Sequence, residues 1–509
     1  PFFFLFTTIT GSTDGIILAA RVLFIIFHAT VSIVIYSRIR KYGYVSVFAS
    51  VLYFIYTPYD IMAMSYNTMG LDFVTLAGVI MGTASYKKKL PLIVSGVAFA
   101  AAVLCWPYLA VAYILYGICV LIHTFIKNKE TKFILKSELF AGKTFLFFSI
   151  GIFALAAVFL VFALTRVSIK EIFNYLPYLM TDPEHPQIAL GTRFGMYFKS
   201  IYNCHSHFKI ALFSYLVMIV VMIIDRKRKS HRSIYLIVTT AIVIFCYVLL
   251  LPQLTYSTYN AIMFPLIFIG ITSYILCENK PKPLFASLFV PGIIYSFAIC
   301  FSSNQYFYVI SMVITASNIA SYVFLAQLLR EMKTTQDNIE YAVWVKRGSF
   351  LFVAFMIFLQ GAFQITVKSE HCFWESGNTS NLTAQIKNGP AKGIYTNVNN
   401  CNTYEQIYSD LQYYKNKQED KILFLTSKTW CYLAVDFPYG TLSAWISGEK
   451  PSSVERLKTY YRVNYEEIPK YIYIPKDSEW DFTNIYNDAG ASGYSVEEND
   501  ISYKLEKIN

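Results

Sequence analysis

The sequence is poor in charged residues, which make up 15% of its 509 residues, while hydrophobic residues make up 55%. This shortage of charge excludes an ordinary soluble protein and predicts a membrane protein with many spans. The net charge is +11, but the basic residues fall in short clusters between apolar runs. We therefore relate the charge to membrane topology and expect no nucleic-acid partner.

The sequence also lacks the motifs of several common chemistries. Its nine cysteines form no Cys-x-x-Cys pair and no set with histidine at zinc spacing. The last third has no glycine-rich phosphate loop and no Gly-x-Ser-x-Gly elbow, and the apolar part has no convincing inverted repeat of the kind that transporters carry. No methionine or signal peptide precedes Pro1, so we expect the sequence to continue a longer reading frame.

Long apolar runs are abundant, and they predict a mostly α-helical bundle of about twelve spans within residues 1–367. Several runs are short for a hydrocarbon core of about 30 Å, so we expect tilted helices or helices buried in the bundle. Trp106-Pro107 should split one long run into two crossings, because proline breaks a helix. The predicted spans are 16–36, 44–57, 70–85, 90–104, 108–124, 144–164, 210–224, 233–251, 261–276, 284–301, 307–328 and 349–365.

Basic clusters alternate with polar turns along these spans. The positive-inside rule places the basic clusters in the cytoplasm, and we expect a bacterial cytoplasmic membrane. The polar turns, the long loop at 165–209 and everything after Ile365 should then lie outside. The basic clusters are 38–41, 87–89, 127–143, 226–232, 280–282 and 330–347.

Residues 368–509 have a different composition, rich in polar residues and without any run that could cross a bilayer. We expect them to form a soluble extracytoplasmic α/β domain with short strands at 393–398, 421–426 and 471–474. A capping box, Thr403-x-x-Gln406, should open one helix, and Ser452-x-x-Glu455, after Pro451, should open a second. The first helix carries an apolar stripe of Tyr404, Ile407, Leu411 and Tyr414.

Residues 57–70 place Asp60, Tyr66 and Asn67 between two apolar runs. An acid and an amide are poor residues to leave in lipid, so Asp60 should lie at a membrane–water boundary or in a polar cavity. Asp60 is our candidate catalytic residue, with Tyr66 and Asn67 as substrate-binding residues. The alternative is a solvated turn between two helices. His28 lies alone in a span, where a hydrogen-bonded core histidine is favoured over a proton relay.

The 165–209 loop carries a second set of candidate substrate-binding residues. They could position an acceptor, bind a divalent cation through oxygen ligands or, for the cations, face a phosphate. Alternatively, the acids make a rigid turn between prolines and the cations pair with lipid phosphates. The residues are Asp182, Glu184, His185, Arg193 and Lys199.

Two segments in roughly the first 125 residues carry a family resemblance. The first runs from Pro1-Phe-Phe-Phe-Leu-Phe through Gly11 to Ile17-Leu-Ala-Ala-Arg, ahead of a long span and a basic turn. The second runs from Ser95-Gly-Val-Ala to Cys105-Trp-Pro. By the order of their elements they resemble the GT-C class of membrane glycosyltransferases, which includes the protein O-mannosyltransferases and the aminoarabinose transferases.

The resemblance implies transfer of a sugar from a polyprenyl-phosphate or polyprenyl-diphosphate donor to a glycan, lipid or protein acceptor on the outer face, with inversion at the anomeric carbon. The main catalytic Asp of that class lies in the first outer loop, which would precede Pro1. A second acidic position matches Asp60. The class often has a pair of acids there, whereas Ile61-Met62 follow Asp60, so we assign no metal ligands although a divalent cation is possible. The span walls would hold the prenyl tail among the membrane lipids, and the outer domain would guide the acceptor.

Two other classes compete with this expectation. A polysaccharide polymerase or ligase also has many spans and a large outer loop, but usually has no α/β domain added at the C-terminus. A non-enzymatic transporter or flippase is the third possibility. An Asp-bearing outer loop upstream of Pro1 would favour the glycosyltransferase over both.

Overall fold

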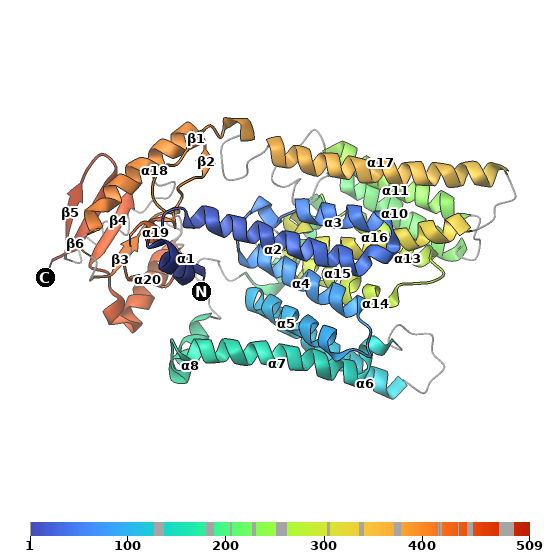
Figure 1. Cartoon of the computed structure of the whole chain (residues 1–509), viewed down its shortest axis with the longest axis horizontal. Coiled ribbons are helices and arrows are strands. Elements are labelled where there is room, and N and C mark those ends of the chain that lie inside the picture. The colour runs from blue at the N-terminus through green and yellow to red at the C-terminus, as the bar shows by residue number, and fades with distance from the viewer. Residues whose placement is uncertain are drawn as a thin grey trace. The chain divides into compact units, whose positions relative to one another are not determined.

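The computed structural model describes residues 2–126, 137–179, 188–203, 206–225, 231–250, 262–302, 306–334, 340–370, 378–415, 417, 420–435, 437–444, 451–477 and 493–508 (Figure 1). The chain forms two compact units. The larger, here called the bundle unit, comprises Leu23–Arg166 and Leu190–Gly377. The smaller, here called the α/β unit, comprises Pro1–Val22, Val167–Ala189 and Asn378–Asn509. The α/β unit therefore takes in two earlier segments besides the C-terminal residues that were expected to form a domain.

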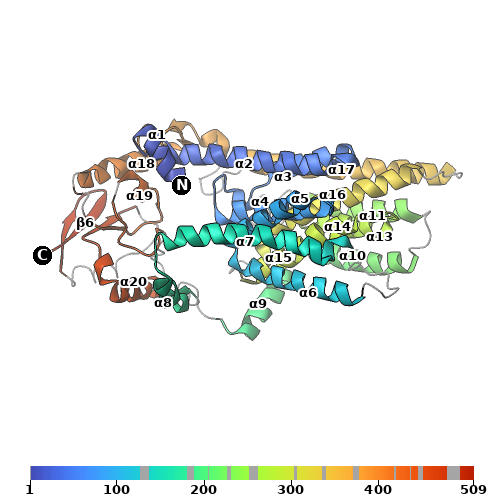
Figure 2. The same ribbon diagram turned by 60° about the horizontal axis from the view of Figure 1, so that its bottom comes forward.

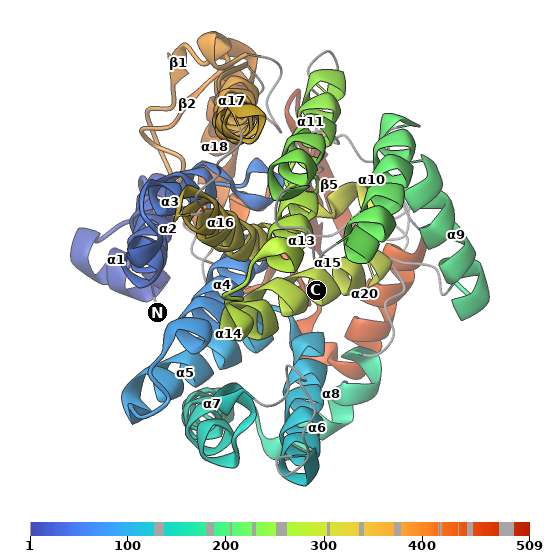
Figure 3. The same ribbon diagram turned by 90° about the vertical axis from the view of Figure 1, so that its right-hand side faces the viewer.

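The bundle unit consists of helices, many of which run along the viewing direction of Figure 3. α2 (Ile16–Ile39) begins in the α/β unit and continues into the bundle unit. The other helices are α3 (Tyr44–Ile55), α4 (Tyr66–Thr83), α5 (Lys89–Cys105), α6 (Ala110–Ile126), α7 (Gly142–Leu164), α9 (Leu190–Asn203), α10 (Ser206–Asp225), α11 (Arg232–Leu250), α13 (Leu266–Leu276), α14 (Lys282–Leu284), α15 (Val290–Ser302), α16 (Ser311–Thr334) and α17 (Glu340–Glu370). Short helical turns are η1 (Arg40–Tyr42), η2 (Pro58–Asp60), η3 (Pro107–Leu109), η5 (Glu138–Phe140), η8 (Phe285–Phe289) and η9 (Tyr306–Val309).

A helix lies at each of the places where we predicted a span, and the break at Trp106-Pro107 is confirmed. The predicted number of spans is not confirmed. Among the described residues, six helical segments are long and apolar enough to cross a membrane, and α3, α5 and α13 are apolar but shorter. The six are Ile16–Tyr42, Pro107–Phe125, Gly142–Leu164, Arg232–Leu249, Lys282–Phe301 and Val343–Glu370.

The outer helices of the bundle unit expose apolar side chains, which is typical of an integral membrane protein. On α6, Val111 is 56% and Ile114 61% exposed, and on α7 Phe153 is 62% and Val158 65% exposed. Soluble monomers rarely expose apolar patches of this extent. Such a surface is compatible with contact to lipid.

α16 lies inside the bundle unit, where α3, α4, α13 and α15 pack around it (Figure 3). Every residue from 316 to 326 is buried. Its small polar side chains therefore bond within the protein: Ser317 donates to the Phe289 carbonyl at 2.9 Å, and Asn318 donates to the Met263 carbonyl at 2.8 Å. A helix that is enclosed on all sides can carry polar residues only where they find such partners.

Described residues of several basic turns lie at one end of the bundle unit. Arg330 donates to the carbonyl of Lys41, and Arg232 pairs with Glu278 at 2.7 Å. At the other end, the Gly70 backbone approaches the indole of Trp106. This separation agrees with the predicted alternation of basic and polar turns, while the orientation in the membrane stays a prediction.

The 165–209 segment contains helices where we had expected a long outer loop. These are α8 (Ile169–Leu179), in the α/β unit, and α9, in the bundle unit. Ser168 and Glu171 cap α8 reciprocally: the Ser168 amide donates to Glu171 Oε2 at 2.6 Å, and the Glu171 amide donates to Ser168 Oγ at 3.2 Å. The Ser-x-x-Glu capping pattern was present in the sequence.

The α/β unit has a four-stranded sheet between helices, as Figure 2 shows with α18 and α20 on its two sides. The strand order is β3-β4-β6-β5, with β3 parallel to β4 and the other pairs antiparallel. A second, two-stranded sheet pairs β1 with β2. The elements are α1 (Phe2–Thr10), β1 (Ala384–Gln385), β2 (Tyr395–Thr396), α18 (Val398–Leu411), β3 (Ile422–Phe424), α19 (Cys431–Ala434), α20 (Pro451–Val463), β4 (Tyr471–Pro475), β5 (Tyr494–Glu498) and β6 (Ser502–Lys507), with 3-10 turns η10 (Thr379–Asn381), η11 (Gln412–Tyr414) and η12 (Tyr465–Glu467).

Alternate residues of the central strands pack on opposite faces of this sheet. Phe424 and Tyr473 join Leu411 of α18 in one core cluster, while Leu423 and Ile472 join a cluster with α20. The three expected strands and the apolar stripe of the first helix are thus confirmed. The expected capping box was wrong, because α18 begins earlier, at an Asn397 side chain that accepts from the amide of Asn400.

Candidate functional site

The segment that carries Asp60 leaves α3 in a turn of unusual backbone conformation. Pro58 stands at the start of η2, where it cannot continue the α3 helix. Tyr59 and Asp60 have φ angles of 55° and 54°, in the left-handed region that residues other than glycine rarely adopt. Such residues cost about 1–3 kcal/mol each, and they persist where surrounding contacts hold them. The turn therefore holds Asp60 in a defined position at the end of the bundle unit opposite the basic turns.

Lys368, in the last turn of α17, provides the main contact of Asp60. Its Nζ lies 2.5 Å from Asp60 Oδ1 and donates to Thr57 Oγ1 at 3.1 Å. The Asp60 side chain is 10% exposed and that of Lys368 is 22% exposed, so the pair is largely shielded from solvent. The sequence reasoning missed Lys368, because nothing in the chain indicates that residues about three hundred positions apart would meet.

The electrostatics of Asp60 reflect two opposing effects. Burial raises the pKa of its carboxyl above the ordinary value, while the charge and hydrogen bond of Lys368 and the hydrogen bond of Thr57 oppose this rise. A carboxyl with a raised pKa accepts a proton more readily than an ordinary one, which is the property of a general base. A solvated turn, the alternative from the sequence, does not describe a carboxylate that is shielded and paired.

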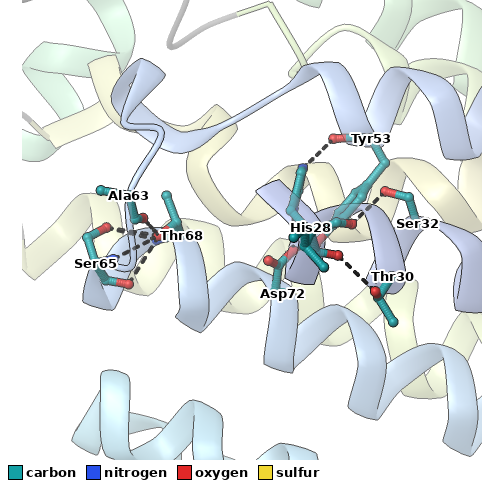
Figure 4. Close-up of polar contacts among 9 residues, drawn as sticks. His28, Thr30, Ser32, Tyr53, Ala63, Ser65, Thr68 and Asp72 are labelled. Atoms are coloured by element: carbon teal, nitrogen blue, oxygen red, sulfur yellow. Dashed lines mark hydrogen bonds and ion pairs between the residues drawn. The ribbon is translucent and has the colours of Figure 1, made fainter. Parts of the chain in front are cut away.

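Tyr66 and Asn67 lie in the first turn of α4, six and seven residues beyond Asp60. Ser65 caps this helix: the Thr68 amide donates to Ser65 Oγ at 3.2 Å, and the Ser65 amide donates to Thr68 Oγ1 at 3.0 Å (Figure 4). Tyr66 is 64% exposed, whereas Asn67 is buried. The first turn of a helix is the positive end of its dipole, so Tyr66 stands where an anion is favoured.

An apolar groove of about 520 Å³ lies between α4, α5, α6, α7 and α15. Its lining includes Tyr108, next to the Trp106-Pro107 break, and Phe140 of η5, and along α6 it extends as far as Cys119. Gly70 of α4 lies against Trp106: a Cβ at Gly70 would come within 2.8 Å of the indole ring. This contact ties α4 to the break beside the groove. Asp60 itself does not line the groove.

The second set of predicted site residues lies elsewhere. Arg193 and Lys199 are on α9, and Arg193 donates to the Phe301 carbonyl at 3.4 Å. In Figures 2 and 3, α9 and α3 lie at opposite edges of the bundle unit, so Arg193 is not brought to Asp60. Lys199 is exposed. Asp182, Glu184 and His185 lie outside the described residues.

His28 and Asp72 form a buried pair that the sequence reasoning missed. His28 Nδ1 lies 2.7 Å from Asp72 Oδ1, and the Tyr53 hydroxyl donates to the same oxygen at 2.7 Å (Figure 4). The expectation of a packed, hydrogen-bonded core histidine is confirmed, but His28 does not stand alone. The signal that could have found the pair is one histidine and one aspartate in neighbouring apolar spans.

Within the described residues, no group of three or more histidine, cysteine, aspartate or glutamate side chains could hold a metal ion. A divalent cation therefore stays a prediction, and it would have to be bound mainly by the phosphate of the substrate.

No protein-family model matches the chain, and no curated protein matches it.

Proposed function

We propose that the chain belongs to a membrane glycosyltransferase that takes a sugar from a polyprenyl-phosphate donor and transfers it to an acceptor on the outer face of a bacterial cytoplasmic membrane. The apolar groove along α6 is the observation that carries the proposal. Its volume of about 520 Å³ lies within the range of about 300–1,000 Å³ that ligand sites occupy. An isoprenoid chain is a ligand that needs a long apolar wall within a membrane bundle.

The polar end of the bundle unit supplies the groups that transfer requires. In the reaction, the bond between the anomeric carbon and the phosphate oxygen breaks, and a bond from the acceptor hydroxyl oxygen forms on the opposite face of the sugar. The hydroxyl proton goes to a carboxylate, and the leaving phosphate keeps the electron pair. Positive charge grows on the sugar ring in the transition state, so a carboxylate and a cation close together suit this chemistry.

Asp60 and Lys368 are the residues that we assign to these roles. Asp60 would take the acceptor proton, and Lys368 would face the departing phosphate. Their direct contact of 2.5 Å describes the free protein. A donor phosphate that binds Lys368 would compete with Asp60 for the ammonium, and it would leave the carboxylate ready to bond the acceptor hydroxyl.

Groove variants test the proposal. Ala112 lines the groove, whereas Ala156 is exposed on α7 and does not line it. We expect Ala112→Phe to lower the retention of a synthetic polyprenyl-phosphate hexose by about tenfold, which corresponds to about 1.4 kcal/mol of lost contact. Ala156→Phe should retain the donor as the parent does. The measurement is mass spectrometry of lipid that stays bound after purification in detergent, with the melting profile as a control of folding.

Equal retention by parent and Ala112→Phe would contradict the assignment of the groove, and no retention by the parent would contradict the donor class.

A transporter or flippase is the second candidate, because it would explain a buried ionisable pair such as His28 and Asp72 within the spans. Reconstituted vesicles separate the two: a transferase releases polyprenyl phosphate from the donor, whereas a flippase moves intact donor between leaflets.

A further inference from the structure

The contact of His28, Tyr53 and Asp72 joins α2, α3 and α4 in the interior of the bundle unit (Figure 4). His28 is 3% exposed, Tyr53 is 2% exposed and Asp72 is fully buried. The imidazole also stacks on the rings of Phe24 and Phe54, with centroids 5.5 and 5.7 Å away. The polar groups of this cluster must therefore satisfy one another, because bulk water does not reach them.

The hydrogen-bond geometry determines how many protons the cluster holds. His28 Nε2 lies 3.2 Å from the Tyr53 carbonyl, which can only accept, so Nε2 carries a hydrogen. His28 Nδ1 lies 2.7 Å from Asp72 Oδ1. If the imidazole were neutral and the carboxylate ionised, two lone pairs would face each other across that distance. A second hydrogen must therefore lie between Nδ1 and Oδ1.

We propose that His28 and Asp72 form a buried proton-binding site, with one captive proton shared between Nδ1 and Oδ1 that holds α2 against α3 and α4. The pair is then neutral overall, either as imidazolium with carboxylate or as imidazole with carboxylic acid. Removal of the proton would leave a net negative charge in an apolar interior, which is strongly unfavourable. The proton is thus a structural ligand of the bundle, and this inference does not depend on the proposed function.

Two contacts favour the imidazolium form. The Tyr53 hydroxyl donates to Asp72 Oδ1 at 2.7 Å, which stabilises the charged carboxylate. The Tyr53 carbonyl lies in the last turn of α3, which ends at Ile55, and the dipole at a helix C-terminus favours a cation. Asp72 Oδ2 has no hydrogen-bond partner within the described residues, which opposes an ionised carboxylate, so the proposal includes both forms of the neutral pair.

The titratable groups that face the pair from the neighbouring helices are tyrosines. Tyr53 of α3 touches it directly, and Tyr322 of α16 stands across a small cavity that Tyr53, Asn318 and Gln360 of α17 also line. This cavity has a volume of about 10 Å³, the size of one water molecule. Asn318 lines it, and its Oδ1 has no hydrogen-bond partner within the described residues. The cavity meets the cluster only through Tyr53, because neither His28 nor Asp72 lines it.

Nitrogen spectroscopy of histidine tests the proposal directly. Protein labelled with ¹⁵N-histidine is compared with His28→Gln, and the difference isolates the His28 ring. At about pH 8, above the ordinary histidine pKa of about 6.5, we expect hydrogen on both ring nitrogens, or one bare nitrogen together with an Asp72 carboxylic-acid infrared band that is absent in Asp72→Asn. One bare nitrogen together with an ionised Asp72 overturns the proposal.

The pH dependence of unfolding provides a second test. A folded pair that holds a proton that the unfolded chain has released loses stability as pH rises, so the folding equilibrium should shift toward the unfolded state with rising pH. The double variant His28→Gln/Asp72→Asn, whose amides can bond without the captive proton, should lose this slope. An unchanged slope in the double variant would contradict a captive proton at His28.

Discussion

Gly96→Ala should disrupt the crossing of α5 and α7, and with it the wall of the proposed donor groove. A Cβ on Gly96 would lie 2.0 Å from the Phe148 carbonyl oxygen, and one on Gly151 would lie 2.0 Å from the Ile93 carbonyl oxygen. The backbone of each helix thus packs directly against a glycine of the other. Small residues permit this close approach of helices in membrane bundles. The helices would have to separate by about 1.4 Å before ordinary contact at 3.4 Å begins.

This separation has a cost that can be worked out approximately. Overpacking of a tight core costs about 1–3 kcal/mol. The shift would also strain the hydrogen bond from the buried Ser95 hydroxyl to the Ala77 carbonyl, which measures 2.8 Å and contributes about 1 kcal/mol. Alanine has a higher helix propensity than glycine, which offsets at most about 1 kcal/mol of this cost. We therefore expect a melting midpoint several degrees lower, and weaker donor retention because Ser95 and Phe148 line the groove.

The assay is thermal unfolding in detergent, with Gly117→Ala on α6 as the matched control. A Cβ on Gly117 would lie 3.6 Å from Phe145, an ordinary contact, so this variant should melt at or above the parent midpoint. A melting midpoint of Gly96→Ala as high as that of Gly117→Ala would contradict the close crossing of α5 and α7 at Gly96.

Three further predictions concern the α/β unit and the membrane topology. Asp410→Ala should destabilise the α/β unit by about 3–5 kcal/mol in denaturant unfolding, because it leaves the buried Lys504 ammonium, now 2.5 Å from Asp410, without its partner. Burial raises the pKa of the Asp410 carboxyl, but the hydrogen bonds from Lys504, Ser502 and Asn499 outweigh it, and the pKa lies below its ordinary value. The stability that this carboxylate provides should therefore be complete above the ordinary pKa of about 3.9. It should disappear as pH falls through the lower pKa of the folded protein, and Asp410→Asn should not show this loss. A cysteine at the exposed Met62 should react with an impermeant thiol reagent in intact cells, and one at Lys282 should not; the reverse pattern would invert the orientation.

Much of the fold was predictable because its signals are local. Apolar runs gave the positions of the bundle helices, and Trp106-Pro107 gave the division between α5 and α6. The number of spans was not predictable in the same way. α16 has the length of a span but carries small polar residues that only its enclosed position satisfies, and α3 and α13 are too short to cross alone. Whether an apolar helix faces lipid or protein depends on packing, which the composition of the helix does not specify.

The candidate site was predictable only in part, for a similar reason. The position of Asp60 between apolar runs indicated a functional candidate, and the structure adds its shielding and left-handed turn. Its partner, Lys368, follows an apolar run on a distant helix, so no local pattern connects the two. The His28–Asp72 pair likewise forms between different helices. Arg193, which was expected in the 165–209 loop as a cation that could face a phosphate, donates to the carbonyl of Phe301 at the end of α15.

The most direct test of the proposed function is donor turnover by Asp60→Asn in the protein that contains this chain. Release of polyprenyl phosphate from a labelled donor is measured in vesicles beside the parent, with Met62→Ala, an exposed neighbour in the same turn, as the matched control. If Asp60 takes the acceptor proton, Asp60→Asn should cut turnover by about 10²-fold or more at temperatures where its melting profile shows it folded, and Met62→Ala should be close to the parent. Near-normal turnover by a well-folded Asp60→Asn would contradict the role that we propose for the Asp60–Lys368 pair.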